Sequence, residues 1–168
     1  MFYTAKSSFN RPANTTQYAQ NELVADNATA GSVTPLRFGV DKSLGKGKIG
    51  RVRIYSSNSA VTAANFNLHL YARDPGTPTN GDNGAFGVAS GRYWLGTVAC
   101  DMSTGSEITT STDKSKGFVI TGGIQFDIEA EGNWAAGKAI YGLLETATSA
   151  TYTPISGETF EVSLEIEF

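Results

Sequence analysis

The feature that most constrains this chain is the strict alternation of apolar and polar residues over its last nine positions. In an extended conformation one face would carry Phe160, Val162, Leu164, Ile166 and Phe168, and the other Glu161, Ser163, Glu165 and Glu167. Burying the apolar side chains at ~1.5–3 kcal/mol each would contribute roughly 8–15 kcal/mol before conformational entropy is subtracted. The pattern therefore predicts a core strand, and we expect C-terminal shortening to be poorly tolerated.

A second stretch predicts two strands joined by a long loop. Residues 65–72 alternate in the same way, with His69 and Tyr71 on the polar face. Residues 73–86 are rich in Pro, Gly, Asn and Asp, which fix φ or tolerate positive φ, so we expect a surface loop. Residues 92–100 are apolar on both faces, which predicts a central strand covered on both sides.

The rest of the chain indicates further short strands and shows no helical stripe. We expect strands over residues 16–24, 33–40, 51–55 and 138–146, a hairpin of residues 117–120 and 123–128, and a Ser/Thr-rich loop over residues 101–116. Eight to ten strands with Gly-rich loops predict an all-β, jelly-roll-like β-sandwich. Residues 1–15 show no period, so we expect an extended N-terminal arm before a single domain of residues 16–168.

Composition and charge exclude several classes of function. The formal net charge of −3 gives no overall attraction to nucleic acid. Residues 1–92 hold ten Lys or Arg against five Asp or Glu, whereas residues 93–168 hold three against eleven. Either strands from the two halves mix these charges in the sheets, or the molecule has a basic and an acidic side suited to docking.

The single cysteine and the N-terminus limit the protein further. Cys100 alone permits neither an intrachain disulfide nor a thiolate zinc site, and we expect it to pack as a small apolar residue. Residues 1–6 lack the apolar run of a signal peptide, and no stretch reaches the length of a transmembrane segment. We therefore expect a soluble protein that is synthesised in a cytoplasm and has no membrane partner.

No residue pattern predicts catalysis or a cofactor. His69 is the only histidine and has no nucleophile motif beside it, so we expect a structural histidine and no enzymatic activity. Gly45, Gly47 and Gly50 match a dinucleotide-binding spacing, but strand-like residues follow where a helix is needed.

Three further groups of residues have a chemical interpretation and a structural one. The side-chain oxygens of Asp74, Asp82 and Asn83 could bind calcium, but their spacing fits no EF-hand loop. We therefore favour the interpretation that these residues cap turns of the loop. The glutamates of the last strand resemble a glycosidase pair only superficially and are expected to form a solvated face. The aromatic residues that could instead form a sugar-stacking platform are Tyr55, Tyr71, Tyr93, Trp94 and Trp134.

Several segments together resemble the capsid cement, or decoration, proteins of tailed bacteriophages, which are small β-sandwich structural proteins. The segments are residues 16–26, 33–38 and 66–71, the block Asp82-Asn83-Gly84-Ala85-Phe86, and residues 94–98. The block is the most specific of them, and the resemblance covers roughly residues 16–100. Where such relatives carry further acidic residues after the block, this chain has residues 87–91, Gly-Val-Ala-Ser-Gly.

The resemblance implies a homotrimer on the outer surface of a phage head, made in the host cytoplasm and free of enzymatic activity. Its partner would be the major capsid protein, whose subunits each trimer would bridge and so hold together. The alternative from another class is a carbohydrate- or receptor-binding β-sandwich module of a virion.

The N-terminal arm is the candidate for the capsid or intersubunit contact. Phe2, Tyr3 and Phe9 would be exposed unless a partner covered them, and exposed aromatic residues tend to mark contact sites. Lys6 and Arg11 would add positive charge toward an acidic capsid surface. We expect this arm to become ordered on binding.

Overall fold

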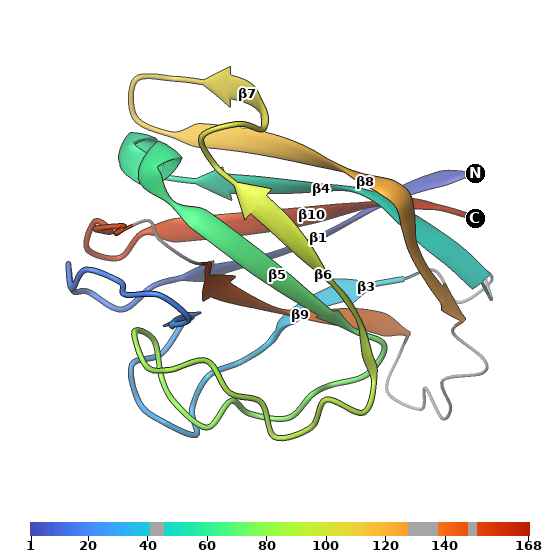
Figure 1. Cartoon of the computed structure of the whole chain (residues 1–168), viewed down its shortest axis with the longest axis horizontal. Helices are drawn as coiled ribbons and strands as arrows, with labels where there is room; N and C mark the ends of the chain where they lie inside the picture. The colour runs from blue at the N-terminus through green and yellow to red at the C-terminus, as the bar shows by residue number, and fades with distance from the viewer. Residues whose placement is uncertain (41–45, 128–137, 148–150) are drawn as a thin grey trace.

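The structure, a computed structural model, describes residues 1–40, 46–127, 138–147 and 151–168 and is almost entirely β (Figure 1). One short 3-10 helix, η1 (Ser59–Ala63), accompanies the strands. The strands are β1 (Phe2–Asn10), β2 (Leu23–Val24), β3 (Leu36–Gly39), β4 (Lys46–Ser56), β5 (Asn65–Tyr71), β6 (Trp94–Asp101), β7 (Ser106–Thr109), β8 (Lys114–Asp127), β9 (Ala139–Thr146) and β10 (Thr159–Glu167).

The strands form two antiparallel sheets packed face to face, which confirms the predicted β-sandwich. The first sheet has the order β1-β10-β4-β8-β7, and the second has the order β2-β9-β5-β6, with β3 also paired to β9. Pairs are nested along the chain: β5 with β6, β4 with β8, β3 with β9, and β1 with β10. This nesting is that of one long hairpin folded over itself, the jelly-roll arrangement.

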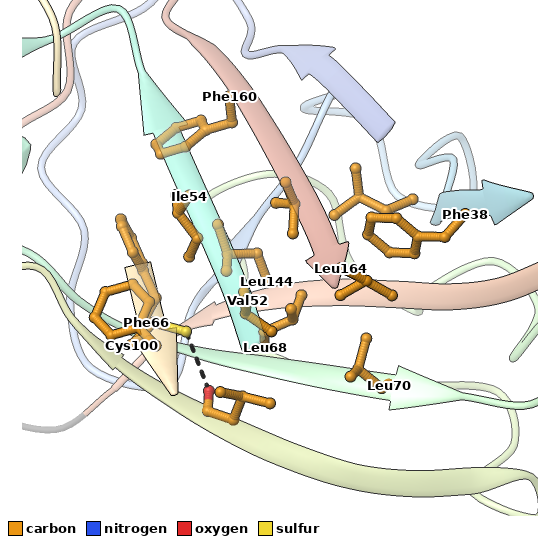
Figure 2. Packing of buried hydrophobic residues seen from close by; sticks show 14 of the residues in the cluster. Phe38, Val52, Ile54, Phe66, Leu68, Leu70, Cys100, Leu144, Phe160 and Leu164 are labelled. Carbon is orange, nitrogen blue, oxygen red and sulfur yellow. Dashed lines mark hydrogen bonds between the residues drawn. The ribbon is translucent and has the colours of Figure 1, made fainter. Parts of the chain in front are cut away.

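The C-terminal alternation places β10 between β1 and β4, as its pattern predicts. Phe160, Val162, Leu164 and Ile166 are completely buried, and they belong to the same core cluster as Phe66 and Leu68 of β5. Cys100 lies in the same core and donates a weak hydrogen bond to the Val98 carbonyl oxygen at 3.5 Å (Figure 2). Burial raises the pKa of this thiol, so Cys100 packs as an apolar residue.

Aromatic rings continue the core toward one end of the sandwich. Phe160 stacks on Phe9 of β1 at 5.4 Å and meets Phe66 edge to face at 5.7 Å. Phe66 in turn meets Tyr152 at 5.9 Å, and Tyr152 stacks on Tyr18 at 6.1 Å. Such contacts add to the energy of burial and fix the relative positions of both termini.

The expectation of a separate N-terminal arm is wrong for residues 2–10. They form the edge strand β1, which pairs with β10 at every position from Phe2 to Asn10, and the two termini lie side by side (Figure 1). Ala5 is buried, and Arg37 of β3 donates its backbone N–H to the Ser7 hydroxyl at 3.0 Å. The strand was missed because Ser7 faces the core while Phe2 faces solvent, which blurs the alternation.

Other predicted boundaries also need correction. Residues 117–128 are not a hairpin: Gly122 and Gly123, both at positive φ, lie within the single strand β8, whose pairing with β4 shifts register. The predicted strand over residues 51–55 is longer, since β4 begins at Lys46, and residues 106–109 of the predicted Ser/Thr-rich loop form β7. The strand β6 is an edge strand, not a central one, and the first predicted strand shrinks to β2.

The long loop after β5 covers the outer face of the second sheet. Phe86 and Val88 from this loop pack against a small apolar cluster that includes Leu23, Tyr71 and Leu143. Burial and the nearby Glu145 carboxylate raise the pKa of Tyr71 to about 12. Tyr71, which the alternation of the sequence predicts to face solvent, is therefore enclosed by the loop.

We predict that deleting residues 1–15 lowers the melting temperature by about 10 °C or more, because it removes a paired strand and unpairs the buried carboxylate that Arg11 neutralises. Thermal unfolding followed by circular dichroism measures the change. Thr4→Ala, at an exposed position of the same strand, serves as the control and should leave the melting temperature nearly unchanged. Equal melting temperatures for the truncated and full chains would contradict the pairing of β1.

Candidate functional site

The five residues predicted for a partner contact separate into an exposed and a buried group. Phe2 is 82% exposed and Tyr3 37% exposed, near the start of the edge strand. Lys6 is exposed but forms an ion pair with Glu161 at 3.0 Å. Phe9 is partly buried and packs against the core, whereas Arg11 is buried and cannot reach a partner, so the prediction is wrong for Arg11.

Arg11 forms a buried ion pair with Asp82 of the long loop. The Arg11 Nη2 atom donates to Asp82 Oδ2 at 2.7 Å, and neither side chain is accessible to solvent. Tyr18 joins the pair, because its hydroxyl donates to Asp82 Oδ1 at 2.5 Å and accepts a hydrogen bond from Arg11 Nε. The Ala25 backbone N–H donates to the same carboxylate oxygen at 2.9 Å.

The charges of this cluster are fixed by their mutual contacts. Burial opposes the charge of Arg11, but Tyr18 and Asp82 together outweigh burial and raise the pKa of the guanidinium. Burial and the Asp82 carboxylate raise the pKa of the Tyr18 hydroxyl, which therefore stays neutral and donates. A buried charge-assisted ion pair of this kind holds two segments of the chain together and offers no surface to a partner.

A second buried carboxylate lies beside the first cluster. Glu158 is completely buried and accepts hydrogen bonds from Ser56 Oγ at 2.5 Å, from Asn58 Nδ2 at 3.4 Å and from the Tyr152 hydroxyl. Burial, and then Glu158, raise the pKa of Tyr152. The Glu158 carbonyl also accepts from the Arg11 backbone N–H at 2.8 Å, so the two clusters brace the same end of the sandwich.

The Asp82–Phe86 block is thus a structural anchor for the long loop. Asp82 donates its backbone N–H to Asn27 at 2.7 Å, and a side chain at Gly81 would collide with the backbone of Ala28. Asn83 adopts a left-handed conformation with φ 65°, which Asn tolerates better than most residues. The turn-capping interpretation is therefore wrong for Asp82, whose carboxylate forms a buried ion pair, and holds for Asp74, which accepts a hydrogen bond from the Gly76 backbone N–H at 2.9 Å.

His69 lies between a hydroxyl and a carboxylate on the outer face of the second sheet. Its Nδ1 atom lies 2.8 Å from Thr97 Oγ1, and its Nε2 atom lies 2.6 Å from Glu145 Oε2. The ring also stacks on Phe86 at 4.5 Å, so it supports the loop that covers this face. Sequence reasoning could not identify these partners, because Thr97 and Glu145 are 28 and 76 positions away.

The charged residues of the first sheet pair with one another across its outer face. The column of basic side chains on β4 runs beside the acidic column of β10, with Arg53 and Glu165 2.9 Å apart and Lys48 and Glu167 3.2 Å apart. The charge asymmetry of the sequence is therefore mixed within this sheet, as the first of the two interpretations predicts. Exposed pairs of this kind contribute little to stability.

Two other sequence candidates are placed apart or outside the described residues. Gly47 and Gly50 lie within β4, and the strand continues to Ser56 where a dinucleotide site needs the start of a helix, which argues against dinucleotide binding. The proposed aromatic platform does not assemble, because Tyr55 lies on the first sheet while Trp94 lies on the second. Tyr71 is buried, and Trp134 falls outside the described ranges.

The described residues contain no group of three or more His, Cys, Asp or Glu placed to hold a metal ion. They also contain no helix long and apolar enough to cross a membrane.

Comparison with known proteins finds only weak similarity to solved structures. No known sequence family and no curated protein matches the chain. A xylan-binding module, CBM15, is 9% identical with a TM-score of 0.33, and the match covers 96% of each chain. A chain from the structure of the empty head of turnip yellow mosaic virus is 12% identical with a TM-score of 0.22, and the match covers 98% of this chain and 79% of that one. Both scores are too low to support an argument about function.

We predict that Asp82→Asn lowers the free energy of unfolding by about 3–5 kcal/mol, because it leaves the buried Arg11 guanidinium without its counter-charge. Urea unfolding measures the loss. Asp74→Asn provides a matched control in the same loop, where the carboxylate is exposed and caps Gly76 at 2.9 Å; it should change the free energy by less than about 0.5 kcal/mol. Equal, small losses for both variants would show that the buried pair does not hold the loop.

Proposed function

We propose that this protein is a cement protein that binds the outer surface of a tailed-phage head and bridges major capsid protein subunits. The sequence resemblance supplies the class of function, and the exposed apolar end of β1 supplies a contact surface. Met1 is 80% exposed and Phe2 82% exposed, next to the partly exposed Tyr3. An apolar group of this kind on an edge strand is a common docking feature.

The position of this group on a paired strand changes how binding would work. Phe2 lies opposite Glu167 in the β1–β10 ladder, and the N-terminal amine donates to the Phe168 carbonyl oxygen at 3.1 Å. The contact surface is therefore ordered before any partner arrives. Binding through it avoids the entropy cost that a flexible arm would incur on ordering.

Stabilisation of a head would arise from multivalency. A trimer presents three copies of the same exposed end, and each copy engages a different capsid subunit at a high effective concentration. Outward pressure from packed DNA would then have to break several contacts at once. The proposal includes the outer virion surface as the location, synthesis in the host cytoplasm, and no enzymatic activity.

We predict that Phe2→Ser weakens retention on heads by about tenfold, because it removes an exposed apolar anchor without touching the core. The measurement is co-sedimentation with tailed-phage heads assembled from a major capsid protein, which is to be sought in the reading frames that flank the gene of this chain. Val119→Ser is the matched control, since Val119 is 79% exposed on β8, away from the N-terminal strand.

Light scattering on the same preparations checks that the full chain and both variants form trimers. If Phe2→Ser binds heads as well as the full chain does, the N-terminal end is not part of the contact. A full-length protein that stays monomeric and does not sediment with heads would overturn the cement function itself.

We predict that His69→Ala leaves retention on heads unchanged and lowers the melting temperature by a few degrees, because the ring packs on Phe86 and bonds Glu145. Head co-sedimentation and thermal unfolding provide the two measurements. Hydrolysis of a p-nitrophenyl ester by the full-length protein, lost in His69→Ala, would show instead that the Thr97–His69–Glu145 arrangement is catalytic.

A further inference from the structure

The outer face of the first sheet is hollowed beside Tyr55. The hollow has a volume of about 350 Å³ and is lined by Lys6, Arg53, Tyr55, Ser115, Glu161 and Ser163, which come from four neighbouring strands. This volume is within the range of small-ligand sites. The hollow arises because small side chains form its floor, Ser163 being 2% exposed, while longer side chains form its walls.

A second, smaller hollow of about 90 Å³ continues the first toward the other edge of the sheet. Arg53 and Ser115 line both hollows, and Gly117, Ser106 and Ile108 extend the lining to β7. Gly117 leaves room for the Arg51 guanidinium, since a Cβ at this position would lie 2.5 Å from Arg51 Nη2. The two hollows form a groove across five strands, or ~19 Å at ~4.8 Å per strand spacing.

The groove offers donors and acceptors in alternation next to one aromatic ring. Glu161 and the serine hydroxyls supply acceptors, while Lys6 and Arg53 keep donors beyond those in their ion pairs with Glu161 and Glu165. Tyr55 sits directly between Glu161 on β10 and Ser115 on β8. Arg51 Nε has no hydrogen-bond partner.

We propose that this groove binds an uncharged oligosaccharide. A sugar hydroxyl both donates and accepts, so a chain of sugars matches a lining that alternates carboxylate, hydroxyl, ammonium and guanidinium groups. The C–H face of one sugar ring would lie on the Tyr55 ring. The elongated shape, open along its length, suits a linear chain more than a compact metabolite.

The same lining disfavours other ligands. The cations of the groove are already balanced, because Lys6 pairs with Glu161 and both arginines approach Glu165, within 3.5 Å for Arg51 and 2.9 Å for Arg53. A phosphate or nucleic-acid backbone would need an excess of positive charge. An apolar ligand would find only Tyr55 and the rim residue Ile108.

The test is binding of the purified full-length protein to a printed array of neutral, uronic-acid and sialylated oligosaccharides, followed by titration calorimetry with the best neutral glycan. We expect retention of neutral glycans, about tenfold weaker binding for Tyr55→Ala, and near-normal binding for Tyr55→Phe, which keeps the ring. Trp94→Ala is the control, because Trp94 is 55% exposed but lies on the second sheet. Unchanged melting temperatures establish that each variant is folded.

Three outcomes would overturn the proposal: no retention of any neutral glycan, binding lost in Trp94→Ala but kept in Tyr55→Ala, or retention confined to acidic glycans and abolished by salt. The last result would indicate a charge-driven contact. Because these measurements use no capsid, their failure leaves the cement function standing, and failure of head binding leaves the groove unaffected.

Discussion

The buried ion pair between Arg11 and Asp82 is the interaction on which the arrangement of this protein depends. It joins the end of the first strand to a loop 71 positions later, and neither side chain touches water. Hydrogen bonds from Tyr18 and from the Ala25 backbone N–H to the carboxylate offset part of the cost of removing the two charges from water. The pair therefore specifies one position for the loop and one for the N-terminal strand.

A series of aromatic contacts connects this ion pair to the hydrophobic core. Tyr18 stacks on Tyr152, whose hydroxyl also donates to the buried Glu158. Tyr152 in turn contacts Phe66, which contacts Phe160. Polar networks of this kind favour a single arrangement because each unmet partner is costly. At the other end of β1, pairing with β10 holds the backbone of Phe2 in place although its side chain faces solvent.

The two outer faces of the sandwich are consequently different surfaces. The long loop covers the second sheet and encloses Tyr71, whereas the outer face of the first sheet stays open, with paired charges and a groove beside Tyr55. The proposed capsid contact at Phe2 and the proposed saccharide groove share that open side but use different residues. A jelly roll accommodates either use, so function here depends on the sites and not on the fold.

The sequence alone determined the elements whose two faces differ sharply. Alternation located β10, β5 and β9 within about a residue, and with the Gly-rich loops it predicted the sandwich, because burial of one face demands a second sheet. Only the tertiary structure decided the roles of β1, of the glycines in β8 and of Arg11. A strand with Ser7 inward and Phe2 outward carries little period, two adjacent glycines fit a bulge as well as a turn, and a buried arginine needs a partner that only folding brings close.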